Sequence, residues 1–230
     1  MFYIDPFYIL LSLPALLLGT IAQILVKYFY SKYSRIANVS NINGVEVVEK
    51  VVKEYGLNIR LNISLHNLED YYNPISNELT LSENVARMPS IASVGIASHE
   101  LGHAIQDKNK SILVSMRNYI VPIVNIGSTL GYILFLIGLI FQIFNLVIFG
   151  IVLFSLSTIF TVITLPIEID ASVKAVNIIR KLGLLHEDEI SGVKNVLIAA
   201  SLTYVASVFQ SLTNLLYYVF QALGVRRKRQ

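Results

Sequence analysis

The chain has 230 residues, of which 54% are hydrophobic and only 14% are charged, and its formal net charge is +3. A soluble domain of this length carries about 25% charged residues, so the composition predicts a membrane protein. The chain contains no cysteine, which excludes a disulfide framework and a cysteine-ligated zinc site. Any metal ion must therefore be held by imidazole and oxygen ligands.

The first predicted element is an apolar helix over about Pro6–Leu25, long enough to span a bilayer core of about 30 Å. It lacks a preceding basic stretch and a small-residue cleavage site, so we expect a membrane anchor rather than a cleaved signal peptide. A more polar stretch, residues 27–117, follows this anchor and predicts a small α+β part.

The polar stretch is predicted to begin with one helix and three strands. Val45–Glu54 has an apolar and a charged face and ends before Gly56, and Ile59–Ile63 alternates like a strand. Tyr71–Tyr72 and Leu79–Ser82 lie on either side of a polar turn, as in a β-hairpin.

The second strand of this hairpin is a candidate substrate-binding edge. An exposed edge strand can bind an extended peptide by adding it to the sheet, which would make Leu79, Thr80 and Leu81 substrate-binding residues. The alternative is that the strand is simply the structural edge of a small α+β unit.

A helix predicted from about Pro89 to Asp107 carries the most informative motif, His99-Glu100-Leu101-Gly102-His103. Residues four apart lie on nearly one face of a helix, so the two histidines can ligate one metal ion. The pattern His-Glu-x-x-His is typical of zinc metallopeptidases, in which the glutamate is the general base for a zinc-activated water. Glu100 is therefore the candidate catalytic residue, and Gly102 leaves room for another backbone to approach.

The alternative is a chance match with only a structural role. The motif follows Ser90–Ser98, a run of small and apolar residues that predicts a buried helix. Buried His and Glu side chains need partners, and Zn²⁺ would provide one, so we favour a zinc site. His66 and His186 lack the motif spacing, and we expect both at the surface.

Two further apolar segments, about Tyr119–Ile143 and Leu146–Leu165, are separated only by a break at Phe144–Asn145. This arrangement predicts an antiparallel transmembrane hairpin over residues 118–166. The hairpin returns the chain to the side of the membrane on which the motif helix lies.

Two carboxylates follow the hairpin, and a catalytic zinc site usually has three protein ligands. We predict Glu168 as the third ligand because its side chain is longer and lies nearer the membrane. Asp170 is the second choice, or it orients a histidine or pairs with Lys174. The alternative is that both acidic residues merely begin a helix after Pro166.

Clusters of Lys and Arg place the polar parts of the chain relative to the membrane. They follow the first apolar segment, precede the second and follow the third, which puts residues 27–117 and the connector 167–195 in the cytoplasm. The site is therefore predicted on the cytoplasmic side of a multi-pass cell-membrane protein.

The fourth apolar segment, about Val196–Leu223, contains many polar side chains. Such a segment crosses the membrane, lies within the bundle, re-enters, or breaks near Asn214. Its Tyr204 hydroxyl could stabilise an oxyanion, or it could be an interhelical or interfacial tyrosine. The basic tail, residues 226–230, suits an anionic membrane surface or is simply solvated.

Taken together these segments predict a mainly α integral membrane protein, with three to four apolar helices and a small zincin-like α+β part. The predicted divisions are an anchor, a metallopeptidase part, a hairpin, a connector, an apolar helix and a tail, over residues 1–26, 27–117, 118–166, 167–195, 196–225 and 226–230.

Several motifs resemble those of the YugP-type neutral zinc metallopeptidases, a family of bacterial membrane proteins. The similar stretches cover nearly the whole chain in the same order, and they are Tyr72–Pro74, Ser98–Gln106, Leu165–Ser172 and Ala199–Ala206. Asn73 stands where the family pattern has Asp. The resemblance implies a zinc-dependent membrane peptidase.

We therefore expect a membrane-bound, gluzincin-like zinc endopeptidase that acts on peptide or protein substrates, membrane proteins included. Its partners are expected to be these substrates and the lipid bilayer, with no nucleic acid. One alternative is a site-2-type intramembrane protease, but the Leu-Asp-Gly motif of that class does not occur in the sequence. Another is a non-catalytic membrane protein with a structural zinc or no metal, which would have no need of Glu100.

Overall fold

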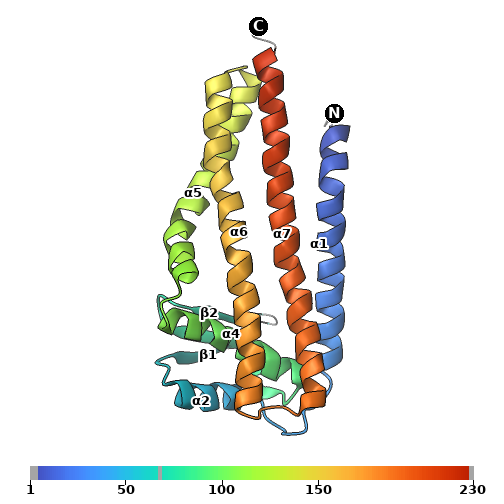
Figure 1. The fold of residues 1–230 in the computed structure, drawn as a ribbon, viewed down its shortest axis with the longest axis vertical. Coiled ribbons are helices and arrows are strands. Elements are labelled where there is room, and N and C mark those ends of the chain that lie inside the picture. The colour runs from blue at the N-terminus through green and yellow to red at the C-terminus, as the bar shows by residue number, and fades with distance from the viewer. Residues whose placement is uncertain (1–4, 67–68, 228–230) are drawn as a thin grey trace. The chain divides into compact units, whose positions relative to one another are not determined.

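The computed structural model describes residues 5–66 and 69–227, which form helices and one small sheet (Figure 1). The predicted mainly α architecture with a small α+β part is confirmed. The elements in chain order are α1 (Pro6–Tyr33), α2 (Gly44–Tyr55), β1 (Arg60–Ser64), β2 (Tyr71–Asn73), β3 (Glu78–Ser82), α3 (Glu83–Arg87), α4 (Ile91–Lys108), α5 (Ile112–Ile140), α6 (Phe144–Lys181) and α7 (Glu187–Arg227).

The chain divides into two compact units, each made of separate stretches of sequence. The helical unit comprises the described residues of Met1–Ile21, Ser115–Pro166 and Leu202–Gln230. The α+β unit comprises those of Ala22–Val114 and Ile167–Ser201. The sequences of α1, α5, α6 and α7 are long and apolar enough to cross a membrane.

Close contact between α5 and α6 builds the predicted hairpin in the helical unit. A Cβ atom on Gly131 would lie 2.8 Å from the carbonyl oxygen of Gly150, so the two backbones touch where neither residue has a side chain. The turn is Phe141–Ile143, with Gln142 at a φ of 55°. The break predicted at Phe144–Asn145 is therefore wrong by a few residues, because those residues already begin α6.

Two of the alternatives left open by the sequence do not occur. Pro166 lies inside α6 and does not start a new helix; a proline is tolerated in such an apolar helix because neighbouring groups can satisfy the freed carbonyl. Nor does α7 break near Asn214. The side chain of Asn214 accepts hydrogen bonds from the Tyr8 hydroxyl and the Gln210 amide, so its polar group is satisfied without interrupting the backbone. Of the basic tail, Arg226 and Arg227 end α7, and residues 228–230 lie outside the described residues.

The α+β unit contains the end of α1 followed by α2, a helix that the sequence predicted. Asn43 and Glu46 form a reciprocal capping box at its start, and Gly56 ends it in the left-handed region at a φ of 57°. The β2–β3 hairpin is antiparallel, as predicted, whereas β1 pairs with β3 in parallel.

The strand order β1-β3-β2 contradicts the expectation that β3 is an edge strand. Because β3 is hydrogen-bonded on both sides, its backbone cannot add a further strand. Leu79, Thr80 and Leu81 are also buried. The parallel partner β1 takes the side of β3 that a simple hairpin leaves open, so β2 is the edge strand nearest the motif helix.

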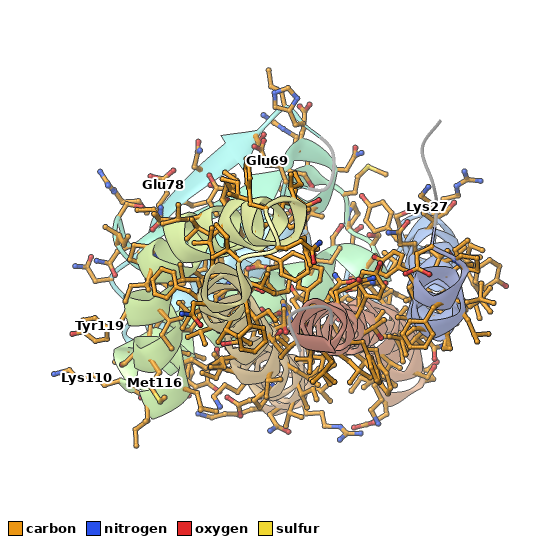
Figure 2. All side chains as sticks on the ribbon, turned by 90° about the horizontal axis from the view of Figure 1, so that it is seen from above. Lys27, Glu69, Glu78, Lys110, Met116 and Tyr119 are labelled. Atoms are coloured by element: carbon orange, nitrogen blue, oxygen red, sulfur yellow. The ribbon has the colours of Figure 1, made fainter. Side chains whose placement is uncertain are left out.

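The motif helix α4 is the centre of the α+β unit. The Ser90 side chain accepts a hydrogen bond from the Ser93 amide and caps its start. The helix packs against α2, α3 and β2, and Gly95 and Gly102 let α7 and α6 approach its other side. Figure 2 labels two charged side chains of this unit, Glu78 at the start of β3 and Glu69 in the connection before β2.

The contact between Gly131 and Gly150 predicts that adding one methyl group at position 150 lowers the stability of the protein. Alanine is favoured over glycine in a helix by about 1 kcal/mol, but at position 150 its Cβ atom would lie 2.5 Å from the Phe135 amide nitrogen. We expect Gly150→Ala to lower the melting temperature in detergent by about 5 °C. Gly224→Ala is the control, because nothing lies within 4 Å of its Cβ position; an equal effect of both changes would contradict the contact.

Candidate metal centre

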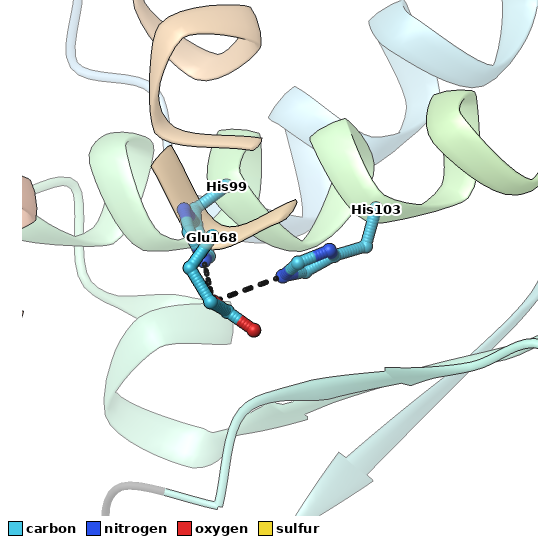
Figure 3. A group of neighbouring side chains, drawn as sticks. All are labelled: His99, His103 and Glu168. Atoms are coloured by element: carbon cyan, nitrogen blue, oxygen red, sulfur yellow. Dashed lines mark ion pairs between the residues drawn. The ribbon is translucent and has the colours of Figure 1, made fainter. Parts of the chain in front are cut away.

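Two histidines of α4 and one glutamate of α6 converge on a single point (Figure 3). The Nε2 atoms of His99 and His103 each lie 3.4 Å from Glu168 Oε2. Glu168 is buried, whereas both imidazoles are partly open to solvent. The carboxylate of Glu168 therefore lies between the two rings, and solvent reaches the group from the histidine side.

This geometry fits a zinc ion. Ligands arranged tetrahedrally at about 2.0–2.1 Å from Zn²⁺ are about 3.3 Å apart, close to the 3.4 Å separations in the site. Two imidazoles and one carboxylate form a common ligand set of catalytic zinc sites, which leaves a position for water. A buried carboxylate also needs compensation for its lost hydration, which a divalent cation would supply.

A backbone contact between the two helices brings Glu168 to the histidines. A Cβ atom on Gly102 would lie 2.7 Å from the carbonyl oxygen of Ala171. The absence of a side chain at this position lets α6 pass directly over the motif; the sequence predicted room for another backbone here, and the structure shows that it is the backbone of α6. Ala171 lies three residues beyond Glu168 on α6, so this contact sets how far the carboxylate reaches.

Glu100 lies beside the ligand group without belonging to it, and it is hydrogen-bonded to the sheet. Its Oε2 atom accepts a hydrogen bond from the main-chain N–H of Tyr72 at 3.1 Å. Glu100 is buried, so this N–H replaces part of the hydration that its carboxylate loses. The predicted base is therefore next to the ligands and bonded to the edge strand β2.

Burial raises the pKa of Glu100, and the carboxylates of Glu168 and Asp70 raise it further against the opposing effect of the two imidazoles. A carboxylate with a raised pKa accepts a proton more readily. Burial alone would lower the pKa of His103, but hydrogen bonding to Glu168 and the charge of Glu100 outweigh it and raise that pKa overall. The same negative surroundings would attract a metal cation, whose binding would release the histidine proton.

The outer nitrogens of the two imidazoles have different partners. His103 Nδ1 lies 3.0 Å from Gln106 Oε1, and His99 Nδ1 lies 3.3 Å from Ser172 Oγ. Asp170 is not in the ligand group; it forms an ion pair with Lys174 and accepts a hydrogen bond from Gln106. This arrangement corresponds to the second role considered for Asp170, in which it pairs with a basic residue close to a histidine.

Gln106 and the Tyr72 amide were missed from the sequence. Gln106 follows His103 by three residues on the same helix, a spacing that places their side chains together and could have identified it. Tyr72 contacts Glu100 through its main-chain N–H. Every residue except proline has this group, so the residue type could not have identified it.

The remaining predicted site residues lie elsewhere. His66 and His186 are exposed and outside the ligand group found among the described residues. Tyr204 lies in the part of α7 that belongs to the helical unit, and its role stays a prediction. Asn73 shapes the β2–β3 turn, because its Oδ1 accepts a hydrogen bond from the Ile75 amide at 2.9 Å.

Comparison with known proteins identifies the family. Residues 8–223 match the family described as "Putative neutral zinc metallopeptidase". The chain belongs to this family. This family member is also 38% identical over 220 residues to the "Putative membrane protease YugP" of Bacillus subtilis (strain 168), across 95% of this chain and 98% of that relative. No solved structure matches this family member. The resemblance inferred from the motifs is confirmed, and homology makes this member a membrane zinc peptidase in broad terms.

The Gly102 contact generates a prediction about metal affinity in this family member. In Gly102→Ala the new methyl group must push the Ala171 backbone away, because a carbonyl oxygen at 2.7 Å cannot rotate aside. Glu168 then withdraws from the histidines, and we expect zinc affinity to fall at least about 10-fold, measured by competition with a chelating dye.

Gly95→Ala is the matched control for this experiment. It adds a methyl group to the same helix, but that group meets only Val193 side-chain atoms, the nearest at 3.1 Å. Zinc affinity equal to wild type in Gly102→Ala would contradict the role assigned to the backbone contact.

Proposed function

We propose that the protein is a zinc-dependent endopeptidase, with His99, His103 and Glu168 as metal ligands and Glu100 as general base. The observation that carries the proposal is the position of Glu100, buried beside the three converging ligand atoms but not part of the ligand group. A structural metal site has no need of a buried carboxylate that lies beside its ligands without joining them.

The chemistry follows from the placement of these side chains. When bound, zinc supplies Lewis acidity, which lowers the pKa of a water molecule to about 7 and polarises a peptide carbonyl. Glu100 takes the proton from the attacking water and delivers it to the nitrogen of the departing amine. Glu168 and the histidines hold the reacting centre beside that carboxylate, so the proton travels a short distance.

The edge strand β2 is suited to hold an extended substrate. All three residues of β2 have register partners on β3, and Tyr72 lies opposite Leu79. The Tyr72 N–H donates its hydrogen bond to Glu100 rather than to β3. Residues of an edge strand alternate in this way, so Tyr72 presents its N–H and C=O on the free side. A peptide that pairs with Tyr72 would pass beside the general base. The substrate-binding strand is therefore β2 rather than the central strand β3.

The cytoplasmic side of the membrane is the proposed location of the site. Lys and Arg at the ends of the apolar segments support it, among them Lys32 at the end of α1 and Arg180 and Lys181 at the end of α6. Four crossings would leave the basic tail on the opposite side, so that tail is the exception to the rule. The proposed substrates are peptides or proteins, membrane proteins included.

The role of Glu100 is tested by separating metal binding from cleavage. We expect Glu100→Gln to retain stoichiometric zinc but to cleave an unfolded protein such as casein at least about 100-fold more slowly, because it cannot accept a proton. His103→Ala should lose both zinc and cleavage, and a chelator should inactivate the wild-type protein reversibly. Glu69→Gln, an exposed change, is the control. Wild-type activity in Glu100→Gln would refute the proposed chemistry.

The third ligand is tested by comparing two acidic residues of α6. Glu168→Ala removes a carboxylate 3.4 Å from both imidazoles, so purified protein should contain less than a tenth of the wild-type zinc. Asp170→Ala should still bind one zinc ion, with affinity reduced by about 3- to 10-fold. Release of zinc by the Asp170 change alone would reverse the assignment.

A further inference from the structure

One buried amide, that of Gln106, contacts both helices of the proposed metal centre. Its side chain is fully enclosed at 2% exposure. Its Oε1 atom lies 3.0 Å from His103 Nδ1, and its Nε2 atom donates to the carbonyl oxygen of Ile167 at 2.9 Å and to Asp170 Oδ2 at 2.7 Å. Ile167 directly precedes Glu168. The Gln106 amide therefore links the main chain beside the Glu168 ligand to the imidazole ring of the His103 ligand.

The partners of Gln106 permit only one orientation of its amide. A main-chain carbonyl oxygen and an ionised carboxylate only accept hydrogen bonds, so both must face the NH₂ group. The amide oxygen must then face His103, and this oxygen can only accept. Nδ1 of His103 therefore carries a proton, which leaves Nε2, the ring atom beside Glu168, as the one that can bind a metal ion.

The exposed end of this chain of contacts is held by an ion pair. Lys174 Nζ lies 2.6 and 2.5 Å from the two oxygens of Asp170, which favours the ionised form of that carboxylate. The Ile167 carbonyl by itself fixes the orientation of the amide, and Asp170 faces the same NH₂ group. Lys174 is thus connected to the imidazole of His103 by a series of polar contacts through the side chains of Asp170 and Gln106.

We propose that Gln106 is a positioning residue that, with Asp170 and Lys174, fixes the Nδ1–H tautomer of His103 and ties α4 to α6 beside Glu168. The inference deepens the proposed function and rests on it, since this tautomer leaves the Nε2 atom to bind a metal ion. Among the described residues, the Nδ1 atom of His99 contacts the Ser172 hydroxyl at 3.3 Å, and a hydroxyl can donate or accept. The two histidines are therefore held in different ways.

The test uses Gln106→Met, which keeps the length of the side chain and removes its hydrogen bonds. We expect zinc affinity, measured by chelator competition, to fall 10- to 100-fold. Gln210→Met, which removes a glutamine amide from α7 in the helical unit, is the matched control and should bind zinc like the wild type. Asp170→Ala repeats the test without altering a buried side chain, and should weaken binding less because the Ile167 bond remains.

A second measurement reads the tautomer directly. The chain has four histidines, so ¹⁵N-histidine spectra of zinc-free protein, at a pH where the rings are neutral, can be resolved one ring at a time. His103 should be the Nδ1–H form in the wild type and should gain the Nε2–H form in Gln106→Met, while exposed His66 and His186 stay unchanged.

Zinc affinity within about 3-fold of wild type, together with an unchanged His103 tautomer in Gln106→Met, would overturn the inference. The proposed function fails in a different way, through a wild-type protein that binds no zinc or cleaves no peptide. The tautomer measurement needs no metal, so it tests Gln106 in that case as well.

Discussion

The contact between Gly102 and the backbone of Ala171 is the constraint on which the site depends. Neither ligand helix can present its side chains to the other unless the two backbones meet at this point, because glutamate and histidine side chains are short compared with the usual separation of packed helices, about 8–10 Å. A glycine in the middle of a helix costs about 1 kcal/mol relative to alanine. Gly102 lies between His99 and His103 in the sequence, so the stability lost at this glycine is what allows α6 to approach the two ligands closely.

The site also solves an electrostatic problem. Glu100 and Glu168 are both buried and lie near each other, and two carboxylates that share a low-dielectric space repel. Each is bonded to a different set of partners: Glu168 to the imidazoles, and Glu100 to the Tyr72 amide. Because their hydrogen-bonding partners differ, the two glutamates can have different roles, Glu168 as a metal ligand and Glu100 as a base under the proposed function.

The sequence was informative wherever a local pattern determines structure. The spacing of His99 and His103, the cap at Gly56 and the β2–β3 hairpin depend on neighbouring residues, so they were predictable. Glu168 could be placed near the motif because the chain passes through a hairpin and returns. The position of β1 on the open side of β3 was not predictable, since parallel pairing joins strands that share no turn. The passage of α6 through Pro166 was also missed, because local rules treat proline as a helix end.

The hydrogen bond from the Tyr72 amide to Glu100 has a consequence for selectivity under the proposed function. An N–H group has one proton to donate, and a peptide that adds itself to β2 needs that same proton. When an extended chain pairs with β2, the Tyr72 N–H would then donate to that chain and no longer to the Glu100 carboxylate. Under that function, a molecule too short or too folded to pair with the strand would leave this hydrogen bond intact, whereas an extended polypeptide would replace it.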